Sequence, residues 1–132
     1  MEMPIPLTIT QSESNAWWQI DLGSVQNIDT INILNRTDCC QGRLNDYHVL
    51  VSDEAFASTD LAGSIAQSGV SDFHDPTHST GTRRIPVKRS GRYIRVQLSG
   101  TNYLHLGEVE IMGCAVDQAP DLNCPPIDFT AY

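Results

Sequence analysis

The chain of 132 residues carries a net charge of −8, from 16 acidic and 8 basic residues, and no block of lysine or arginine offsets it. This balance disfavours nucleic acid and anionic membrane surfaces as partners. Hydrophobic residues make up 40% and charged residues 18%, which is ordinary for a globular domain. No apolar run is long enough to span a bilayer. We therefore expect a single domain over residues 1–132, with no nucleic-acid partner and no membrane insertion.

Residues 1–16 show little periodicity and predict an extended lead-in or edge segment. Residues 17–23 alternate between apolar and polar positions, with Trp18 and Ile20 on one face, which is typical of a strand. Both adjacent tryptophans, Trp17 and Trp18, are expected to pack in the core or at a sheet edge rather than under a sugar. Similar patterns predict further strands over residues 28–34, 47–52, 83–87, 92–98 and 104–112.

Residues 53–82 are rich in serine, glycine, aspartate and threonine, and predict loops with a short helical turn around Leu61 and Ile65. His74 and His78 have a spacing that could suit a metal, but Pro76 argues against the helix that would align them. We expect them to be solvated loop histidines.

Residues 114–132 contain three of the prolines and predict an irregular tail. Several short strands, polar turns and almost no helical pattern predict an all-β sandwich or barrel.

The four cysteines of this acidic chain are typical of an oxidising compartment, so we expect a secreted, extracellular protein. Of the three pairings they allow, we favour Cys39–Cys40 with Cys114–Cys124, because the second bond would tie the tail to the last strand. Consecutive Cα atoms lie about 3.8 Å apart, closer than the usual disulfide range of about 4.4–6.8 Å, so Cys39–Cys40 would be a strained ring. Free thiols in a cytosolic protein are the alternative.

The polar loop between the second and third predicted strands concentrates the chemistry of the chain. Arg36 and Arg43 present permanently charged donors in a fixed fork, and Asp38 could brace either one. A ring formed by Cys39 and Cys40 would add a rigid apolar surface beside them. A sugar has an apolar face and a rim of hydroxyls, so the loop suits a sugar. The alternative is a surface ion pair worth about 0–1 kcal/mol beside two unrelated thiols.

Five segments together resemble one family: residues 17–23, 35–40, 49–53, 91–96 and 108–111. They are similar to the F-type lectins, which are fucose-binding domains of the discoidin or coagulation factor V/VIII C-domain superfamily. The resemblance covers residues 17–113. It implies an all-β, discoidin-like jelly-roll β-sandwich with a sugar site among the loops at one end.

The resemblance also implies roles for the loop. Arg36 and Arg43 would donate hydrogen bonds to the hydroxyls and ring oxygen of L-fucose, and Asp38 would orient them. A vicinal disulfide, Cys39–Cys40, would pack on the sugar. No catalytic motif is present, so we expect a lectin rather than an enzyme.

Two departures from the family pattern stand out. The family's site includes a histidine upstream of the first arginine, and this chain has Ile9 or Gln11 at the corresponding positions. A histidine from elsewhere in the chain, His48 or His74, could take its place. A lost hydrogen bond of this kind costs about 0.5–1.5 kcal/mol.

The second departure concerns calcium. The family's N-terminal part, which supplies most of a calcium loop, has no counterpart here. Gly107, through its carbonyl, and Glu108 would form a partial calcium site, which Asp117, Asp121 and Asn123 of the tail could complete.

The first hypothesis is thus a non-catalytic lectin for L-fucose-containing glycans. The alternative is a structural or assembly module that keeps the fold, has lost sugar binding and associates with copies of itself or with a partner chain that completes the sheet. A third is the carbohydrate-binding accessory of a larger glycosidase.

Overall fold

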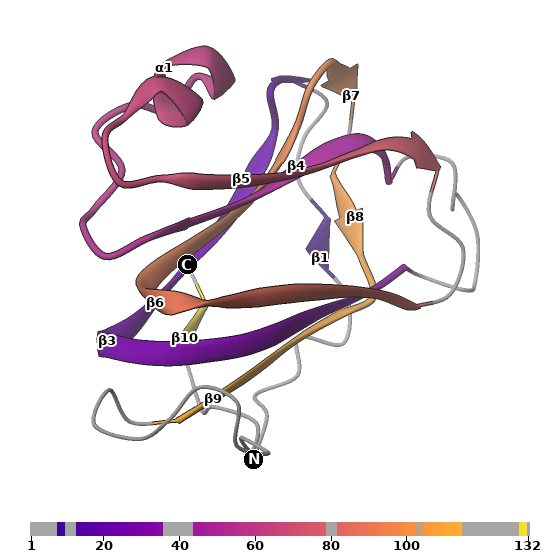
Figure 1. The fold of residues 1–132 in the computed structure, drawn as a ribbon. Helices are drawn as coiled ribbons and strands as arrows, with labels where there is room; N and C mark the ends of the chain where they lie inside the picture. Colours follow the sequence, from indigo (N-terminus) through magenta and orange to yellow (C-terminus); the bar gives the residue numbers. More distant parts are fainter. Residues whose placement is uncertain are drawn as a thin grey trace.

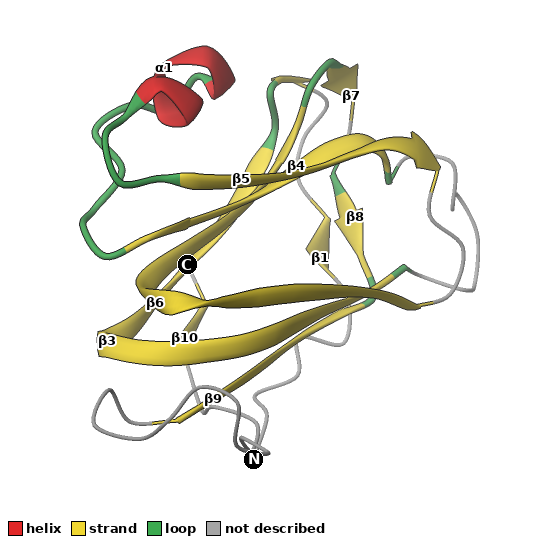
Figure 2. Cartoon of the chain, viewed as in Figure 1, coloured by secondary structure: helices red, strands yellow, loops and turns green. Residues whose placement is uncertain are grey.

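The computed structural model describes residues 8–9, 13–35, 44–78, 82–102, 104–114 and 130–131. Antiparallel strands make up most of this part, with one short helix, which confirms the all-β prediction (Figures 1 and 2). The elements are β1 (Thr8–Ile9), β2 (Glu13–Ser14), β3 (Trp17–Leu34), β4 (Asn45–Ser52), α1 (Leu61–Ala66), β5 (Ser71–His78), β6 (Thr82–Leu98), β7 (Thr101–Asn102), β8 (His105–Leu106), β9 (Glu108–Cys114) and β10 (Thr130–Ala131).

The long strands β3 and β6 pair with each other along most of their length and bend between two layers (Figure 1). One layer has the order β5, β4, second half of β6, first half of β3, β10. The other pairs the first half of β6, the second half of β3 and β9. Two short pairs, β1 with β8 and β2 with β7, complete the described strands. The result is the predicted β-sandwich.

Irregular steps in pairing produce the bend. Between the pairs Asp21–Tyr93 and Gln26–Gly91, β3 has more residues than β6. Gly23 has a φ of +87°, which glycine adopts without steric cost, and its N–H donates to the Asp21 carboxylate at 2.8 Å. The strands predicted separately over 17–23 and 28–34 are therefore one strand with an exposed bulge. Those predicted over 83–87 and 92–98 likewise join into β6.

The core lies between the layers and follows the predicted alternation. Trp18 and Ile20 on β3 are buried, as are Ile94 and Val96 on β6. The burial of these apolar side chains is the main favourable contribution to the free energy of folding. Further core residues are Ala16, Ile28, Ile31, Ile33, Leu44, Tyr47, Val49, Val51, Ile85, Val87, Leu98, Leu104, Leu106, Val109 and Ile111.

Two predictions of irregular structure are wrong. The segment around His74 is not a loop but lies on β5, at the edge of its layer. Pro76 is compatible with this strand because β5 gains an extra residue between the pairs Tyr47–Asp75 and Asn45–His78, and an edge needs no donor on its open side. The tail, predicted to be irregular, contains the short strand β10. The lead-in, predicted as an extended or edge segment, contains the short strands β1 and β2.

Candidate functional site

The predicted ligand-binding residues Arg36, Asp38, Cys39, Cys40 and Arg43 lie outside the described residues. The structure describes the residues on either side of them. Asn35 follows β3 and Leu44 precedes β4, and both are buried. At these two residues, β3 has just ended in one layer and β4 is about to begin in the other.

Gly107 holds the first of these loop ends in place. Its N–H donates to the carbonyl of Leu34 at 2.8 Å. A Cβ at this position would lie 2.7 Å from the carbonyl oxygen of Asn35, so no larger residue fits without a shift. Glu108 follows and pairs with Leu34 across the strands. The junction of β8 and β9 therefore packs directly against the start of the predicted sugar-binding loop.

The partial calcium site does not fit calcium on the described residues alone. Calcium takes six to eight oxygen ligands. The described residues offer one potential metal-binding group of three or more acidic, histidine or cysteine side chains, and Glu108 is not among them. The tail residues Asp117, Asp121 and Asn123 lie outside the described part.

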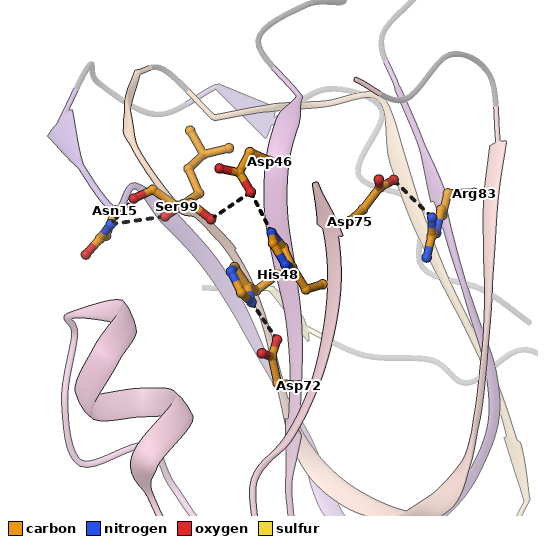
Figure 3. A network of polar contacts seen from close by, with 9 residues as sticks. Asn15, Asp46, His48, Asp72, Asp75, Arg83 and Ser99 are labelled. Carbon is orange, nitrogen blue, oxygen red and sulfur yellow. Dashed lines mark hydrogen bonds and ion pairs between the residues drawn. The ribbon is translucent and has the colours of Figure 1, made fainter. Parts of the chain in front are cut away.

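An ion pair joins the layers near the same end. Arg83 on β6 lies 3.1 Å from the buried carboxylate of Asp75 on β5 (Figure 3). Arg83 adjoins Thr82, which pairs with Leu34 at the end of β3. This contact ties the edge strand β5 to the second layer near the end of β3.

A second polar group lies on the other face of the β4–β5 pair, away from the core. His48 on β4 is directly opposite His74 on β5, and their rings stack with centroids 4.0 Å apart and planes 2° from parallel. The Nδ1 of His48 lies 2.6 Å from Asp72, and the Nε2 of His74 lies 2.5 Å from Asp46 (Figure 3). We call Asp46, His48, Asp72 and His74 the histidine cluster.

Asp46 is firmly held within this cluster. Its backbone has a φ of +52°, a left-handed conformation that is uncommon for a residue with a side chain. The backbone N–H of Ser99 donates to its carbonyl at 2.9 Å, and the Ser99 hydroxyl donates to its carboxylate at 3.1 Å. The hydrogen bond with His74, helped by the one from Ser99, lowers the pKa of Asp46 below its usual value. The carboxylate is therefore ionised at neutral pH.

Another polar group surrounds Arg95, on the face of β3 and β6 that points away from the core. Its guanidinium donates to Gln19 at 2.9 Å, to the Ser58 carbonyl at 2.6 Å and to the Ser64 hydroxyl at 2.8 Å. It also lies over two rings, at 4.8 Å from that of Trp17 and 4.4 Å from that of Phe56. Burial lowers the pKa of Arg95. We call these residues the arginine cluster.

Sequence reasoning found part of the histidine cluster. It singled out His74 but grouped it with His78, whereas the ring against His74 is that of His48 on the neighbouring strand. His48 and His74, the proposed replacements for the family histidine, both belong to this cluster. Ile9, at that histidine's position, pairs instead with His105 across β1 and β8.

The chain matches, over residues 6–96, the F5/F8 type C family of NedA-like, galactose-binding domains. It belongs to this family. A similar curated protein, Fucolectin-5 of Anguilla japonica, is 33% identical over 111 residues, covering 77% of this chain and 52% of the relative. This member of the NedA-like family spans about half the length of the first curated relatives that it matches.

Solved structures agree with this assignment. A Streptococcus pneumoniae fucose-binding module has a TM-score of 0.66 and 27% identity, covering 80% of this chain and 68% of the module. The lectin domain of lectinolysin, complexed with Lewis B antigen, also has a TM-score of 0.66, with 29% identity, covering 83% of this chain and 72% of that one. These relatives confirm the predicted F-type lectin domain and its discoidin-like β-sandwich.

Two further observations bear on cellular context. Cys114 is disulfide-bonded, so it is not the free thiol of the cytosolic alternative. Its predicted partner Cys124 and the pair Cys39–Cys40 lie outside the described residues, so both pairings stay predictions. Among the described residues, no helix has the length and apolar character needed to cross a membrane.

Proposed function

We propose that this chain is a non-catalytic lectin that binds L-fucose-containing glycans through the loop of residues 36–43. The observation that carries the proposal is the similarity to fucolectins and fucose-binding modules, combined with the motif of Arg36, Asp38 and Arg43 in that loop. One of the similar domains was solved with a fucosylated antigen, Lewis B.

In this proposal, Arg36 and Arg43 donate hydrogen bonds to the sugar, Asp38 orients them, and a Cys39–Cys40 disulfide packs against its apolar face. Charge-assisted hydrogen bonds of this kind are stronger than neutral ones. The buried loop ends at Asn35 and Leu44 support the proposal, because fixed ends reduce the entropy lost when a loop orders around a ligand.

The family histidine needs a separate proposal. Ile9 cannot form a side-chain hydrogen bond, and its backbone pairs with that of His105. We propose that either His105 takes this part or the site works without it, with affinity reduced by the lost bond. The variant His105→Ala separates the two cases: weaker fucose binding supports the first, and unchanged binding supports the second.

Titration of the chain with free L-fucose tests the function. We expect saturable binding at millimolar concentration or better, weakened at least tenfold in Arg36→Ala and in Arg43→Ala. Arg84→Ala is the matched control, because Arg84 is an exposed arginine on β6 outside the loop, and it should bind like the wild type. Absence of binding to fucose and to an array of fucosylated glycans would contradict the proposal.

Calcium binding through Gly107, Glu108 and residues of the tail remains a proposal, which thermal melting tests. If calcium stabilises the loop region, then EDTA should lower the melting temperature and added calcium should restore it. An unchanged melting temperature would show that the chain needs no calcium.

The alternative of an assembly module finds less support in the described strands. The edge strand β5 carries the exposed residues Asp72 and Pro76, and charges and proline at an edge oppose strand addition. Light scattering on the isolated chain separates the two functions, since a monomer that binds fucose fits the lectin. Secretion is part of the lectin proposal, and the Cys114 disulfide supports it.

A further inference from the structure

The histidine cluster leaves two imidazole nitrogens and a carboxylate close to one another. The ligand atoms of Asp46, His48 and His74 all lie within 4.8 Å of one another. His48 is buried and supplies a fixed ring, whereas the side chains of His74 and Asp46 are 40% and 45% exposed. The group is therefore anchored on one side and open to solvent on the other.

The contact of His48 with Asp72 decides which nitrogen is available. If Nδ1 of His48 donates its hydrogen to the Asp72 carboxylate at 2.6 Å, then Nε2 keeps a free lone pair. A histidine that ligates a metal almost always donates its other N–H to a carboxylate or carbonyl in this way. Asp72 thus stands where a supporting carboxylate is expected.

The carboxylate of Asp46 is positioned from a different direction. Its left-handed backbone and its two hydrogen bonds with Ser99 hold it on the same face as the histidines. Asn15 in turn donates to the Ser99 carbonyl at 2.9 Å. Uncommon backbone conformations held by their surroundings often occur at binding sites.

We propose that Asp46, His48 and His74 bind a divalent transition metal ion such as Zn²⁺, with Asp72 orienting His48. Two imidazoles and one carboxylate are typical zinc ligands, and they leave a coordination position for solvent. Zinc bonds of about 2.0–2.2 Å place ligand atoms about 3.3 Å apart. A metal lies in the plane of each imidazole that binds it, so the exposed ring of His74 would have to turn out of its stack on His48. The ion would also draw Asp46 inward and replace its ion pair with His74. Calcium is disfavoured, because it prefers oxygen ligands.

None of the three ligands belongs to the proposed sugar-binding residues 36–43, and a bound ion would act on the fold. A bound ion would connect the edge strand β5 to β4 and, through Asp46, to Ser99 after the end of β6. Ligands that bind only the folded state stabilise it. Zinc is therefore expected to raise the melting temperature whether or not the chain binds fucose.

Calorimetric titration of the tag-free chain with ZnCl₂ tests the proposal. We expect one saturable site, weakened at least a hundredfold in His74→Ala, and weakened about 10–100-fold in Asp72→Asn, which removes only the supporting carboxylate. Asp53→Asn is the matched control, since Asp53 contacts Ser90 and Arg89 elsewhere on the surface, and it should bind zinc like the wild type.

Among the three ligands we choose His74 for substitution because its side chain is exposed, so the variant is expected to fold. A melting curve recorded without zinc checks that it does. A spectrum of the Co²⁺-loaded chain, with the intense visible bands of a low-coordinate site, provides an independent measurement. Absence of saturable binding, or equal affinity in His74→Ala and the wild type, would overturn the proposal and leave the cluster as two ion pairs only.

Discussion

The face of β4 and β6 that points away from the core carries two polar groups of opposite character. The arginine cluster is covered by α1 and the loop before it, and Arg95 is only 2% exposed. The histidine cluster makes none of these contacts with α1, and it opens to solvent through the side chains of His74 and Asp46. The two groups lie on the same sheet, since His48 pairs with Gln97 and Leu50 pairs with Arg95.

The difference shows that polar groups on one sheet face can have two roles: one holds a helix in place, and the other is open to a ligand. In the described part of the chain, Arg95 pairs with no carboxylate but with neutral oxygens and aromatic faces. Such a buried charge is costly unless each contact is kept, so the group holds α1 on the sheet. The histidine cluster has carboxylates and exposed nitrogens, so its members can exchange partners. One group is closed by its own contacts, and the other can accept a ligand.

Removal of Arg95 should have the largest effect. Arg95→Ala removes the hydrogen bonds to Gln19, the Ser58 carbonyl and the Ser64 hydroxyl beneath α1, and it removes the ring contacts. We expect the free energy of unfolding to fall by about 3 kcal/mol, measured by urea denaturation. Arg92→Ala, which removes a half-buried arginine of the same strand, should cost about 1 kcal/mol or less. Equal losses in the two variants would contradict the contrast.

Removal of His74 should have a smaller effect on the metal-free chain. Its ion pair with Asp46 is half-exposed on both sides, and its ring stacks on His48 from the open side. We expect His74→Ala to lower the free energy of unfolding by less than about 1 kcal/mol in the presence of EDTA. A loss as large as that of Arg95→Ala would show that the histidine cluster is also a closed structural group.

The smallest expected effect is the pH dependence of the stability that the ion pair between Asp21 and Arg92 provides. The hydrogen bond from Arg92, at 2.7 Å, lowers the pKa of Asp21 in the folded chain. The ion pair therefore adds stability above the unfolded pKa of about 3.9, and that stability is lost as pH falls through the depressed folded value. Wild type and Arg92→Met should differ in free energy of unfolding at pH 7 and converge towards pH 2. A difference that stays constant with pH would contradict this account.

The layers of the fold were predictable because their pattern is local. Alternation placed Trp18, Ile20, Ile94 and Val96 inside, and composition indicated a sheet protein. The same patterns could not show that β3 and β6 each run through their bulge, because a pairing partner far along the chain keeps them extended. The segment around Pro76 resembled a loop by composition, and only its edge position permits a strand there.

The two candidate sites also differ in how far the sequence alone could locate them. The motif of Arg36, Asp38 and Arg43 is contiguous, so the sequence alone located it between two strands. The partnership of His48 with His74 depends on the register of β4 against β5, and register is set by the packing of the whole layer. A contiguous motif can be read from a chain met for the first time, whereas a cross-strand pair cannot.

The short strand β10 has a consequence for how the chain is handled in the laboratory. Thr130 and Ala131 pair with Asp21 and Ile20, on the side of β3 that β6 leaves open. Cleavage just before Thr130 would expose the main-chain amides and carbonyls of β3 at Ile20 and Asp21. An exposed strand edge of this kind can pair with a strand of another molecule. Purification tags are therefore better placed at the N-terminal end, where they leave the pairing of β10 with β3 intact.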